Sequence, residues 1–364
     1  MADELTPTHL TVRLLRLPTR RGLAAAHDPG PESGRLLTIV CAHRADDRSA
    51  VTGWGECSAL NRAGYTSESA QGAYELLSSG GPIDPRSDPM AAAAVDMALL
   101  DVQLRAEQRS LADHLGTTGQ SAPAGAVVGL GTDIETVERV AALVAQGYGR
   151  VKLKIVPGRV VGPVRAVRRD FTDLEIQVDA NASLGTDDLD DLRALESLDV
   201  RVVEQPFAAE DHATAAQLIA STNLVVIADE AVTGASSVEG LVADRAALGI
   251  VVKPPKLGGL TAALATLDQA ARHSLAASLG GVLESALGRH VLAAMAPLPA
   301  FTITGDLSPA GQWLADDPFP DLVLRNGCVA APSHVGIAPD PDRELLARHT
   351  VAVETTTIPQ VLHR

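Results

Sequence analysis

The feature that most constrains the fold is a short apolar segment that recurs about every 25 residues through the last two thirds of the chain. Helical stretches separate these segments, and such a strand–helix unit repeated eight times is typical of a parallel (β/α)8 barrel. An open doubly wound sheet is the alternative, but Gly129 and Gly131 after the first segment lack the third glycine of a dinucleotide-binding pattern. The eight expected strands are residues 124–128, 151–155, 175–178, 200–203, 224–228, 249–252, 275–279 and 301–304.

The first 120 residues have a different pattern. Strands are expected at 10–14, at 36–42 and in a stretch ending at Glu56, and a helix over 90–108 follows Asp88 and Pro89, which suit its first turn. Strands followed by helices predict an α+β module. We therefore predict an α/β protein with an α+β capping domain over 1–120, a barrel over 121–312 and a Pro- and Asp-rich tail over 313–364 that packs back on the cap.

Composition narrows the range of partners. The chain has 45 acidic and 30 basic residues, a net charge of −15, which disfavours binding to nucleic-acid phosphates. No apolar run approaches the roughly 18 residues that span a bilayer, and the N-terminus lacks a secretory pattern. The 3 cysteines fit neither a disulfide framework nor a metal knuckle. These features predict a cytoplasmic protein that binds a small molecule rather than a membrane, with homo-oligomerisation left open.

Lysine is scarce and clustered in this chain. Of the 30 basic residues, 26 are Arg, and the 4 lysines form two pairs, Lys152 with Lys154 and Lys253 with Lys256. Arg stays protonated, whereas Lys can lose its proton when its pKa is depressed. A compositional preference for Arg is the alternative, but the pairing argues against four chance survivors. Lys256 lies beyond its strand and is expected to have a structural or peripheral role.

Ionisable residues follow successive strands, at the end of the barrel where an active site lies. Any one of the acids could be a helix N-cap, but the acids recur at intervals of 25 residues and are flanked by the lysines. In chain order the residues are Lys152 and Lys154 after the second strand, Asp179, Glu204 and Asp229 after the next three, and Lys253 after the sixth.

This arrangement has a chemical explanation. Three converging carboxylates raise each other's pKa, and a divalent cation relieves the repulsion; oxygen ligands without His or Cys favour Mg²⁺ or Mn²⁺. Lys152 and Lys154 share one face of a strand, so repulsion is expected to lower one pKa towards that of a general base. With Lys253 on the far side, this predicts proton abstraction beside a metal-bound carboxylate.

Three further residues are candidates for the same cleft. Asn181 could support the site or form a turn, Glu230 follows Asp229 directly, and Glu284 follows the seventh strand. No His–Asp pair occurs at the strand ends, which disfavours a histidine base.

These residues resemble those of the enolase superfamily, specifically its muconate-lactonizing subgroup, which carries Lys-x-Lys, three acidic metal ligands and a final Lys. Further motifs are similar to the actinobacterial o-succinylbenzoate synthase and N-succinylamino acid racemase branch: 53–57 (GWGEC), 147–155 with Pro157-Gly158, 163–168, 177–181 and Gly305-Asp306. The resemblance covers about residues 9–340. It implies a cap over a barrel, with loops near 18–34 and 54–66 closing the substrate pocket.

The resemblance also implies residue roles. Lys154 would remove the α-proton of a cyclohexadiene-carboxylate, the three acids would hold Mg²⁺ or Mn²⁺, Lys253 would stabilise the enediolate, and Lys152 would tune Lys154. The implied enzyme is an o-succinylbenzoate synthase, a carbon–oxygen lyase of menaquinone biosynthesis. The alternatives are an N-succinylamino acid racemase, another racemase, epimerase or cycloisomerase of the same fold, and, from another class, a non-catalytic barrel with a structural metal.

Two positions depart from the family pattern. Val127 stands where relatives often carry Ser, which bears on substrate identity more than on reaction class. The Asp-x-Asp of dipeptide epimerases is absent after the eighth strand, where Asp306 is followed by Leu and Ser308. The second departure disfavours the epimerase alternative.

Overall fold

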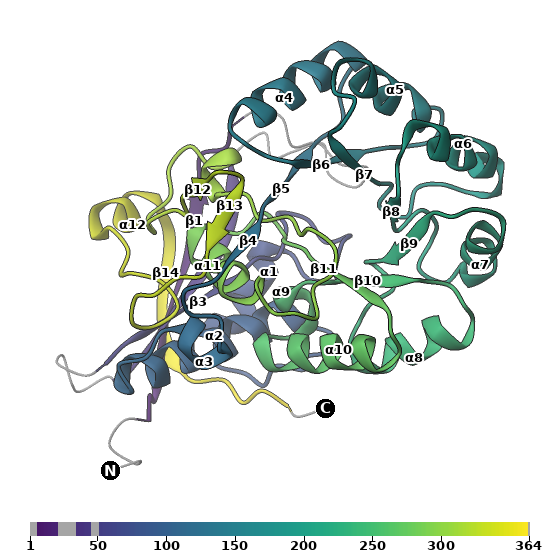
Figure 1. Ribbon diagram of the computed structural model, residues 1–364. Helices are drawn as coiled ribbons and strands as arrows, with labels where there is room; N and C mark the ends of the chain where they lie inside the picture. Colours follow the sequence, from purple (N-terminus) through teal and green to yellow (C-terminus); the bar gives the residue numbers. More distant parts are fainter. Residues whose placement is uncertain (1–5, 21–33, 45–50, 363–364) are drawn as a thin grey trace.

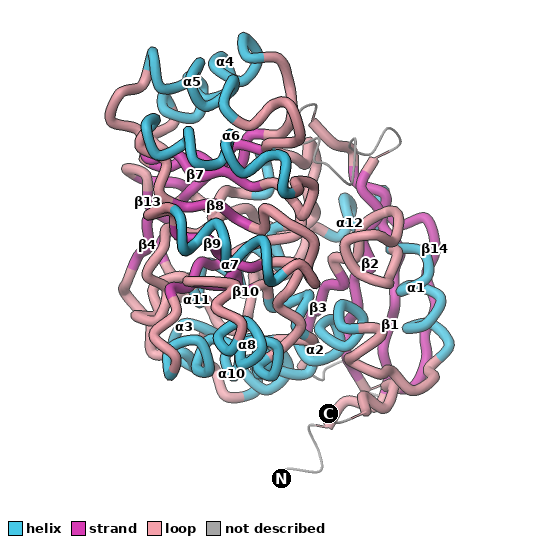
Figure 2. Tube along the Cα trace, turned by 90° about the vertical axis from the view of Figure 1, so that its right-hand side faces the viewer, coloured by secondary structure: helices cyan, strands magenta, loops and turns pink. Residues whose placement is uncertain are grey.

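The computed structural model describes residues 6–20, 34–44 and 51–362. The chain forms two parts, a curled parallel sheet surrounded by helices and an antiparallel sheet with helices against one side (Figure 1). Figure 2 shows the antiparallel sheet as a layer along one flank of the barrel. Most of the expected pocket loop at 18–34 lies outside the described residues.

The parallel sheet has seven strands in sequence order, which confirms the first seven expected barrel strands with their ends shifted by two residues or fewer. The strands are β5 (Gly125–Val128), β6 (Arg150–Lys154), β7 (Glu175–Asp179), β8 (Val202–Glu204), β9 (Val225–Ala228), β10 (Gly249–Val252) and β11 (Ala276–Leu279). The outer helices are α4 (Asp133–Ala145), α5 (Val161–Asp170), α6 (Leu189–Ala194), α7 (His212–Ser221), α8 (Ala235–Ala243) and α10 (Leu260–Arg272).

The eighth strand, expected at 301–304, is the exception. This segment makes only single bridges, Ile303 to Ser278 and Asp306 to Gly125, although the amide of Asp306 also donates to the carbonyl of Leu279 at 2.8 Å. The barrel therefore closes without a continuous ladder. The Arg150 side chain is part of the reason, because its Nε donates to the carbonyl of Thr304 at 3.1 Å and so takes an acceptor that a neighbouring strand would use.

Alternation along β6 sets the direction of the catalytic candidates. Val151 and Leu153 are buried in the core between the sheet and the outer helices. Since successive strand residues point to opposite faces, Lys152 and Lys154 point into the barrel. The same rule applies along the neighbouring strands, so polar side chains at their carboxyl ends gather over the barrel mouth.

The second part is the expected capping domain. Its sheet has the antiparallel order β14–β1–β2–β3, and pairing of β14 with β1 brings the C-terminal tail back onto the N-terminal region. The strands are β1 (His9–Leu17), β2 (Arg35–His43), β3 (Gly53–Cys57) and β14 (Thr350–Thr357), and the main helices are α1 (Ala70–Ser79) and α2 (Pro89–Ala106). The domain boundaries at 120 and 312 stay predictions.

Two glycines of β3 let α2 pack close to the sheet. A Cβ at Gly53 would lie 2.3 Å from the carbonyl oxygen of Ala98, and one at Gly55 would lie 2.0 Å from that of Ala94. Real Cβ atoms do not approach so closely, and overpacking is destabilising. The glycines in the 53–57 motif therefore match the alanine-rich face of α2.

The remaining elements are distributed over both parts of the molecule. None of the helices in the described ranges combines the length and the apolar character that crossing a membrane would need. The elements are α3 (Leu111–Leu115), β4 (Ser121–Pro123), α9 (Pro254–Leu257), α11 (Ala286–Met295), β12 (Leu324–Arg325), β13 (Cys328–Ala330) and α12 (Arg343–His349).

Candidate active site

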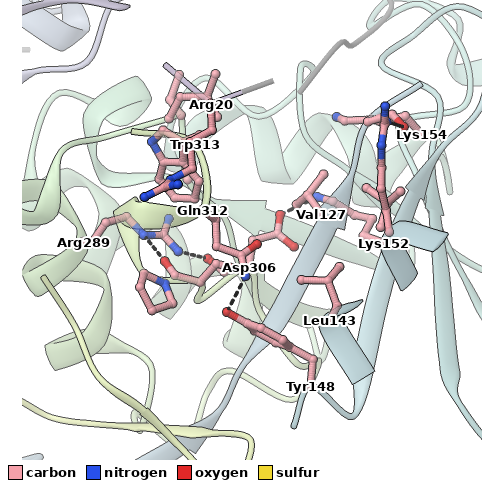
Figure 3. A pocket seen from close by; sticks show the side chains of 18 of the residues that line it. Arg20, Val127, Leu143, Tyr148, Lys152, Lys154, Arg289, Asp306, Gln312 and Trp313 are labelled. Atoms are coloured by element: carbon pink, nitrogen blue, oxygen red, sulfur yellow. Dashed lines mark hydrogen bonds and ion pairs between the residues drawn. The ribbon is translucent and has the colours of Figure 1, made fainter. Parts of the chain in front are cut away.

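A cavity of about 620 Å³ lies at the carboxyl end of the parallel strands. Figure 3 shows Lys152, Lys154 and Val127 on one side of it, and Arg289 and Trp313 on the other. The cap contributes Leu60 and Tyr65 to the lining. Of the sequence candidates, the lining includes Lys152, Lys154, Asp179, Asn181 and Lys253, whereas Glu204, Asp229, Glu230 and Glu284 are not among the lining residues.

Each of the three lysines predicted to be catalytic is paired with one of the predicted acids. Lys154 Nζ donates to Asp179 Oδ2 at 2.6 Å, and Lys152 Nζ donates to Glu204 Oε2 at 2.8 Å. On the other side of the barrel, Lys253 Nζ donates to Asp229 Oδ2 at 2.6 Å. The structure therefore brings all six residues together at the mouth of the barrel.

The two lysines proposed to face the substrate come from well-separated strands. Lys154 ends β6, Lys253 directly follows β10, and β7, β8 and β9 lie between these strands in the sheet. In a sheet curled into a barrel, this separation places the two side chains on different sides of the cavity that both of them line. A substrate between them would therefore present one face to each ammonium group.

The electrostatics of Lys152 differ from the expected repulsion between neighbouring lysines. Burial disfavours its charged form, but Asp306, Glu204 and Asp179 outweigh this effect and raise the pKa of Lys152. Asp306 Oδ2 lies 2.5 Å from Lys152 Nζ, and Asp306 also pairs with Arg150. The repulsion was expected to lower the pKa of one of the two lysines, and Lys152 is not that one, because Asp306 lies beside it.

The three acids were expected to raise each other's pKa, but only Glu204 has a raised pKa. Burial, followed by the charge of Asp179, raises the pKa of Glu204 to about 8. Burial also opposes ionisation of Asp229, but Lys253 and Lys256 outweigh it and lower the pKa of Asp229. Pairing with lysines thus favours the charged forms of Asp179 and Asp229.

The carboxylate oxygens of the three acids are the type of ligand that a hard divalent cation prefers. Asp179 pairs in register with Glu204, and Glu204 pairs with Ile227, two residues before Asp229. The buried oxygens Glu204 Oε1 and Glu230 Oε2 have no hydrogen-bond partner. Within the described ranges, no three His, Cys, Asp or Glu side chains are arranged to share one ion, and a lysine contacts each of the three acids. The donor set fits Mg²⁺ or Mn²⁺ through its chemistry and its unpartnered oxygens.

The three further candidates divide between the site and the surrounding core. Asn181 Oδ1 accepts from Lys154 Nζ at 2.7 Å, and Asn181 Nδ2 donates to Glu230 Oε1 at 3.2 Å. The carboxylate of Glu284 accepts from the Val282 amide at 2.6 Å and pairs with Arg289 at 3.2 Å. The structure thus brings Asn181 and Glu230 to the site and engages Glu284 in the wall behind it.

Lys256 was expected to have a structural or peripheral role, and its burial contradicts the peripheral alternative. Its side chain is buried, and its Nζ donates to the backbone carbonyl of Asp229 and lies 3.4 Å from Asp229 Oδ1. The short helix α9 begins at Pro254, directly after Lys253, and turns the chain so that both lysines reach the same acid.

Sequence reasoning missed Tyr65, which lies in the 54–66 loop that the resemblance implied would close the pocket. Its hydroxyl donates to Asp229 Oδ1 at 2.9 Å and accepts from Lys253 Nζ at 2.9 Å. The ring also faces Lys253 Nζ at 4.8 Å from its centroid, within the range of a cation–π interaction. Asp306, within the quoted Gly305-Asp306 motif, was likewise not assigned a role.

A capped parallel barrel with lysines and acids at the carboxyl ends of its strands is the arrangement expected for the enolase superfamily. A family model described as "Enolase C-terminal domain-like" matches residues 135–345, and the chain belongs to this superfamily.

Three relatives make the similarity more specific. The chain is 33% identical over 347 residues to an N-succinylamino acid racemase from Amycolatopsis sp, covering 89% of this chain and 92% of the relative. It is 29% identical over 374 residues to the o-succinylbenzoate synthase of Bacillus subtilis (strain 168), covering 98% of each. A solved structure of a probable mandelate racemase from Alicyclobacillus acidocaldarius is 30% identical, with a TM-score of 0.84, and covers 97% of this chain and 100% of that one. The chain is therefore an enzyme whose relatives are such synthases and racemases.

Proposed function

We propose that this enzyme removes a proton from the carbon next to a carboxylate, and that its reaction is the dehydration that forms o-succinylbenzoate. The observation that carries the proposal is that Lys154 and Lys253 line one cavity from different sides of the barrel. The Bacillus subtilis relative, which matches almost the whole chain, is named for this reaction.

Lys154 would act as the base. In its neutral form Nζ accepts the α-proton, and the resulting ammonium is held by Asp179 and Asn181, the acceptors that it contacts at 2.6 and 2.7 Å. When the C–O bond on the neighbouring carbon breaks, Lys154 returns this proton to the departing hydroxide, which leaves as water. Lys154 is then neutral again, so one base serves both halves of the dehydration.

Lys253 would supply positive charge on the other side of the substrate. Burial opposes its charged form, but Asp229, Glu204 and Glu230 outweigh this effect and raise the pKa of Lys253. Lys253 therefore stays protonated where negative charge develops on the substrate carboxylate.

Asp179, Glu204 and Asp229 would hold the divalent cation, Mg²⁺ or Mn²⁺. When bound, this cation supplies additional positive charge that stabilises the substrate carboxylate as its negative charge grows. The unpartnered Glu204 Oε1 supports the assignment.

Racemisation of N-succinylamino acids is the second candidate. It is favoured by the Amycolatopsis relative, the most identical of the relatives described above. The same two lysines suit this reaction, because Lys154 can remove the α-proton from one face while protonated Lys253 delivers a proton to the other. Dehydration and racemisation share the abstraction of the α-proton and differ in the second step, which is loss of hydroxide in one and reprotonation of the α-carbon in the other.

The test uses the purified protein with both substrate classes. We expect dehydration of the cyclohexadiene-carboxylate, followed by ultraviolet absorbance, and α-proton exchange of N-succinylamino acids, followed by NMR in D2O. A chelator should abolish both reactions, and added Mg²⁺ should restore them.

Lys154→Ala should lower kcat/KM on the order of 10³-fold, while the control Arg159→Ala, which removes a surface pair with Asp133, should not. Full activity of Lys154→Ala in either assay would refute the mechanism.

A further inference from the structure

The turn that follows Lys253 is too short to hold its own shape. Directly after Lys253 the chain forms α9, a helix of 4 residues that begins with two prolines and ends at Gly258. Helices of this length are not stable alone in water, and the prolines lack amide donors. Within the turn, the amide of Leu257 donates to the carbonyl of Lys253 at 3.2 Å, and the amide of Gly259 donates to that of Pro254 at 3.0 Å. The direction of the Lys253 side chain therefore depends on what the turn packs against.

The turn packs against α2, the long helix of the cap. Both α9 and α10 contact this helix. A small cavity of about 20 Å³ marks the contact, and the residues around it include Ala93, Asp96, Met97 and Leu100 of α2 with Pro254, Pro255, Gly259 and Leu260. Among the described residues that line this cavity, Asp96 alone carries a charge. The contact is otherwise apolar, so Asp96 is the residue that gives it direction.

Asp96 provides an N-terminal cap for α10. This helix begins at Leu260, directly after Gly259, which has no side chain to cap it. Asp96 Oδ2 accepts from the amide of Leu260 at 3.0 Å, across the boundary between the cap and the barrel. A carboxylate at this end of a helix also interacts favourably with the helix dipole. The cap thus holds the chain by the residues that follow α9.

Gly259 allows the carboxylate to approach the turn. Its φ is +120°, a conformation that L side chains rarely adopt, and a Cβ there would lie 2.4 Å from Asp96 Oδ2. Any other residue at this position would displace the carboxylate or the turn. The two segments therefore fit closely, although 164 residues separate Asp96 from Leu260.

We propose that Asp96 is a positioning residue, which fixes the turn after β10 on the cap and so aims the side chain of Lys253. The connection passes from Asp96 to the start of α10, and from Gly259 through Pro254 to Lys253. Lys154 has separate support, because it ends β6 and donates to Asp179 and Asn181. Loss of the Asp96 carboxylate should therefore impair Lys253 and spare Lys154. The inference rests on the proposed function, because that function places the α-carbon of the substrate between the two lysines.

The experiment observes the two lysines separately. The L and D forms of an N-succinylamino acid present the α-proton to opposite faces, so α-proton exchange of each form in D2O reports one lysine. N-succinyl-alanine and N-succinyl-phenylalanine are the probes, and Lys253→Ala identifies the form that depends on Lys253. Asp96→Ala removes the acceptor of the Leu260 amide, whereas Asp96→Asn keeps an oxygen for it. Gln103→Ala is the matched control, because Gln103 is exposed on α2 and its side chain donates to Glu107.

In Asp96→Ala, exchange of the form that depends on Lys253 should fall about tenfold, while the other form stays within about twofold. Asp96→Asn should restore the lost exchange to within about threefold of the unmodified protein, and Gln103→Ala should change neither form. Should Asp96→Ala fail to fold, Gly259→Ala displaces the carboxylate instead and should cause the same selective loss. Equal losses for both forms, or no loss, would overturn the assignment.

A second measurement does not depend on turnover. Hydrogen–deuterium exchange followed by mass spectrometry reports the amides of residues 256–262, which should exchange about tenfold faster in Asp96→Ala than in the unmodified protein or in Gln103→Ala. If the unmodified protein exchanged neither form of the probes but this segment lost protection in Asp96→Ala, the proposed function would fail and the support by Asp96 would stand. Unchanged protection would overturn that support in either case.

Discussion

Asp229 receives more partners than the sequence indicated. Tyr65, Lys253 and Lys256 all donate to it, although only Lys253 was predicted to lie nearby. A buried carboxylate needs such compensation, because an unpaired charge away from water is costly. The cap therefore contributes to the site through Tyr65, which connects the carboxylate to Lys253, the lysine proposed to face the substrate.

We expect Tyr65→Phe to lower kcat by about tenfold or more, with KM changed less than about threefold. The substitution keeps the ring but removes a hydroxyl bonded to Asp229 and Lys253, and hydrogen bonds to charged groups contribute about 1.5–3 kcal/mol. Steady-state kinetics measure the effect. Tyr74→Phe, a substitution in the core of the cap, is the control. An unchanged kcat would show that the hydroxyl does not support Lys253.

The difference between predicted and missed residues has a physical cause. Lys154, Asp179 and Lys253 directly end or follow apolar strands, so their shared position over the barrel follows from local pattern alone. Tyr65 reaches the site through a cap loop, and Asp306 lies on a segment that forms no regular strand. Contacts of this kind depend on how distant segments dock, which strand periodicity does not encode.

At the scale of elements, the segment that closes the barrel is held by side chains more than by a backbone ladder. Asp306 pairs with Arg150 at 2.7 Å and with Lys152 at 2.5 Å, and all three are largely buried. The carbonyl of Thr304 accepts from Arg150. The apolar pattern at 301–304 resembled that of the other strands, but the buried Arg150 replaces part of the ladder.

Asp306→Asn should therefore lower the free energy of unfolding by about 3 kcal/mol, because removing one partner of a buried ion pair leaves the other charge uncompensated. Two cations, Arg150 and Lys152, lose their shared carboxylate. Urea unfolding followed by circular dichroism gives the change. Asp187→Asn, at an exposed position before α6, should stay within about 0.5 kcal/mol. Equal midpoints for Asp306→Asn and the unmodified protein would contradict this account of barrel closure.

At the scale of the whole molecule, a carboxyl group of the cap contacts a helix of the barrel. Glu56 of β3 is fully buried and accepts from the amide of Ser285 at 3.1 Å and from the amide of Gly288 at 3.3 Å, at the start of α11. The sequence showed both parts of the molecule, but not this contact, because 229 residues separate Glu56 from Ser285. Periodicity predicts elements within each part and leaves their docking undetermined.

This contact should make the stability of the molecule depend on pH. Burial raises the pKa of Glu56 to about 7 from 4.5, against the opposing hydrogen bonds of Ser285 and Ser58. Between these values the folded state holds more protons than the unfolded state, so stability falls as pH rises, and the loss is complete above the folded pKa. A shift of this size corresponds to about 3 kcal/mol.

Urea unfolding at pH 5 to 8 of the unmodified protein and of Glu56→Gln isolates this contribution, because Gln has the same shape and does not titrate. The other titrating groups, including His290, whose pKa burial lowers to about 4, are present in both proteins and cancel in the difference. The stability of the unmodified protein relative to Glu56→Gln should fall by about 2 kcal/mol between pH 5 and 7.5 and then level off. Parallel curves would show that Glu56 ionises in the folded protein as it does in the unfolded chain, and that its burial between the cap and the barrel carries no electrostatic cost.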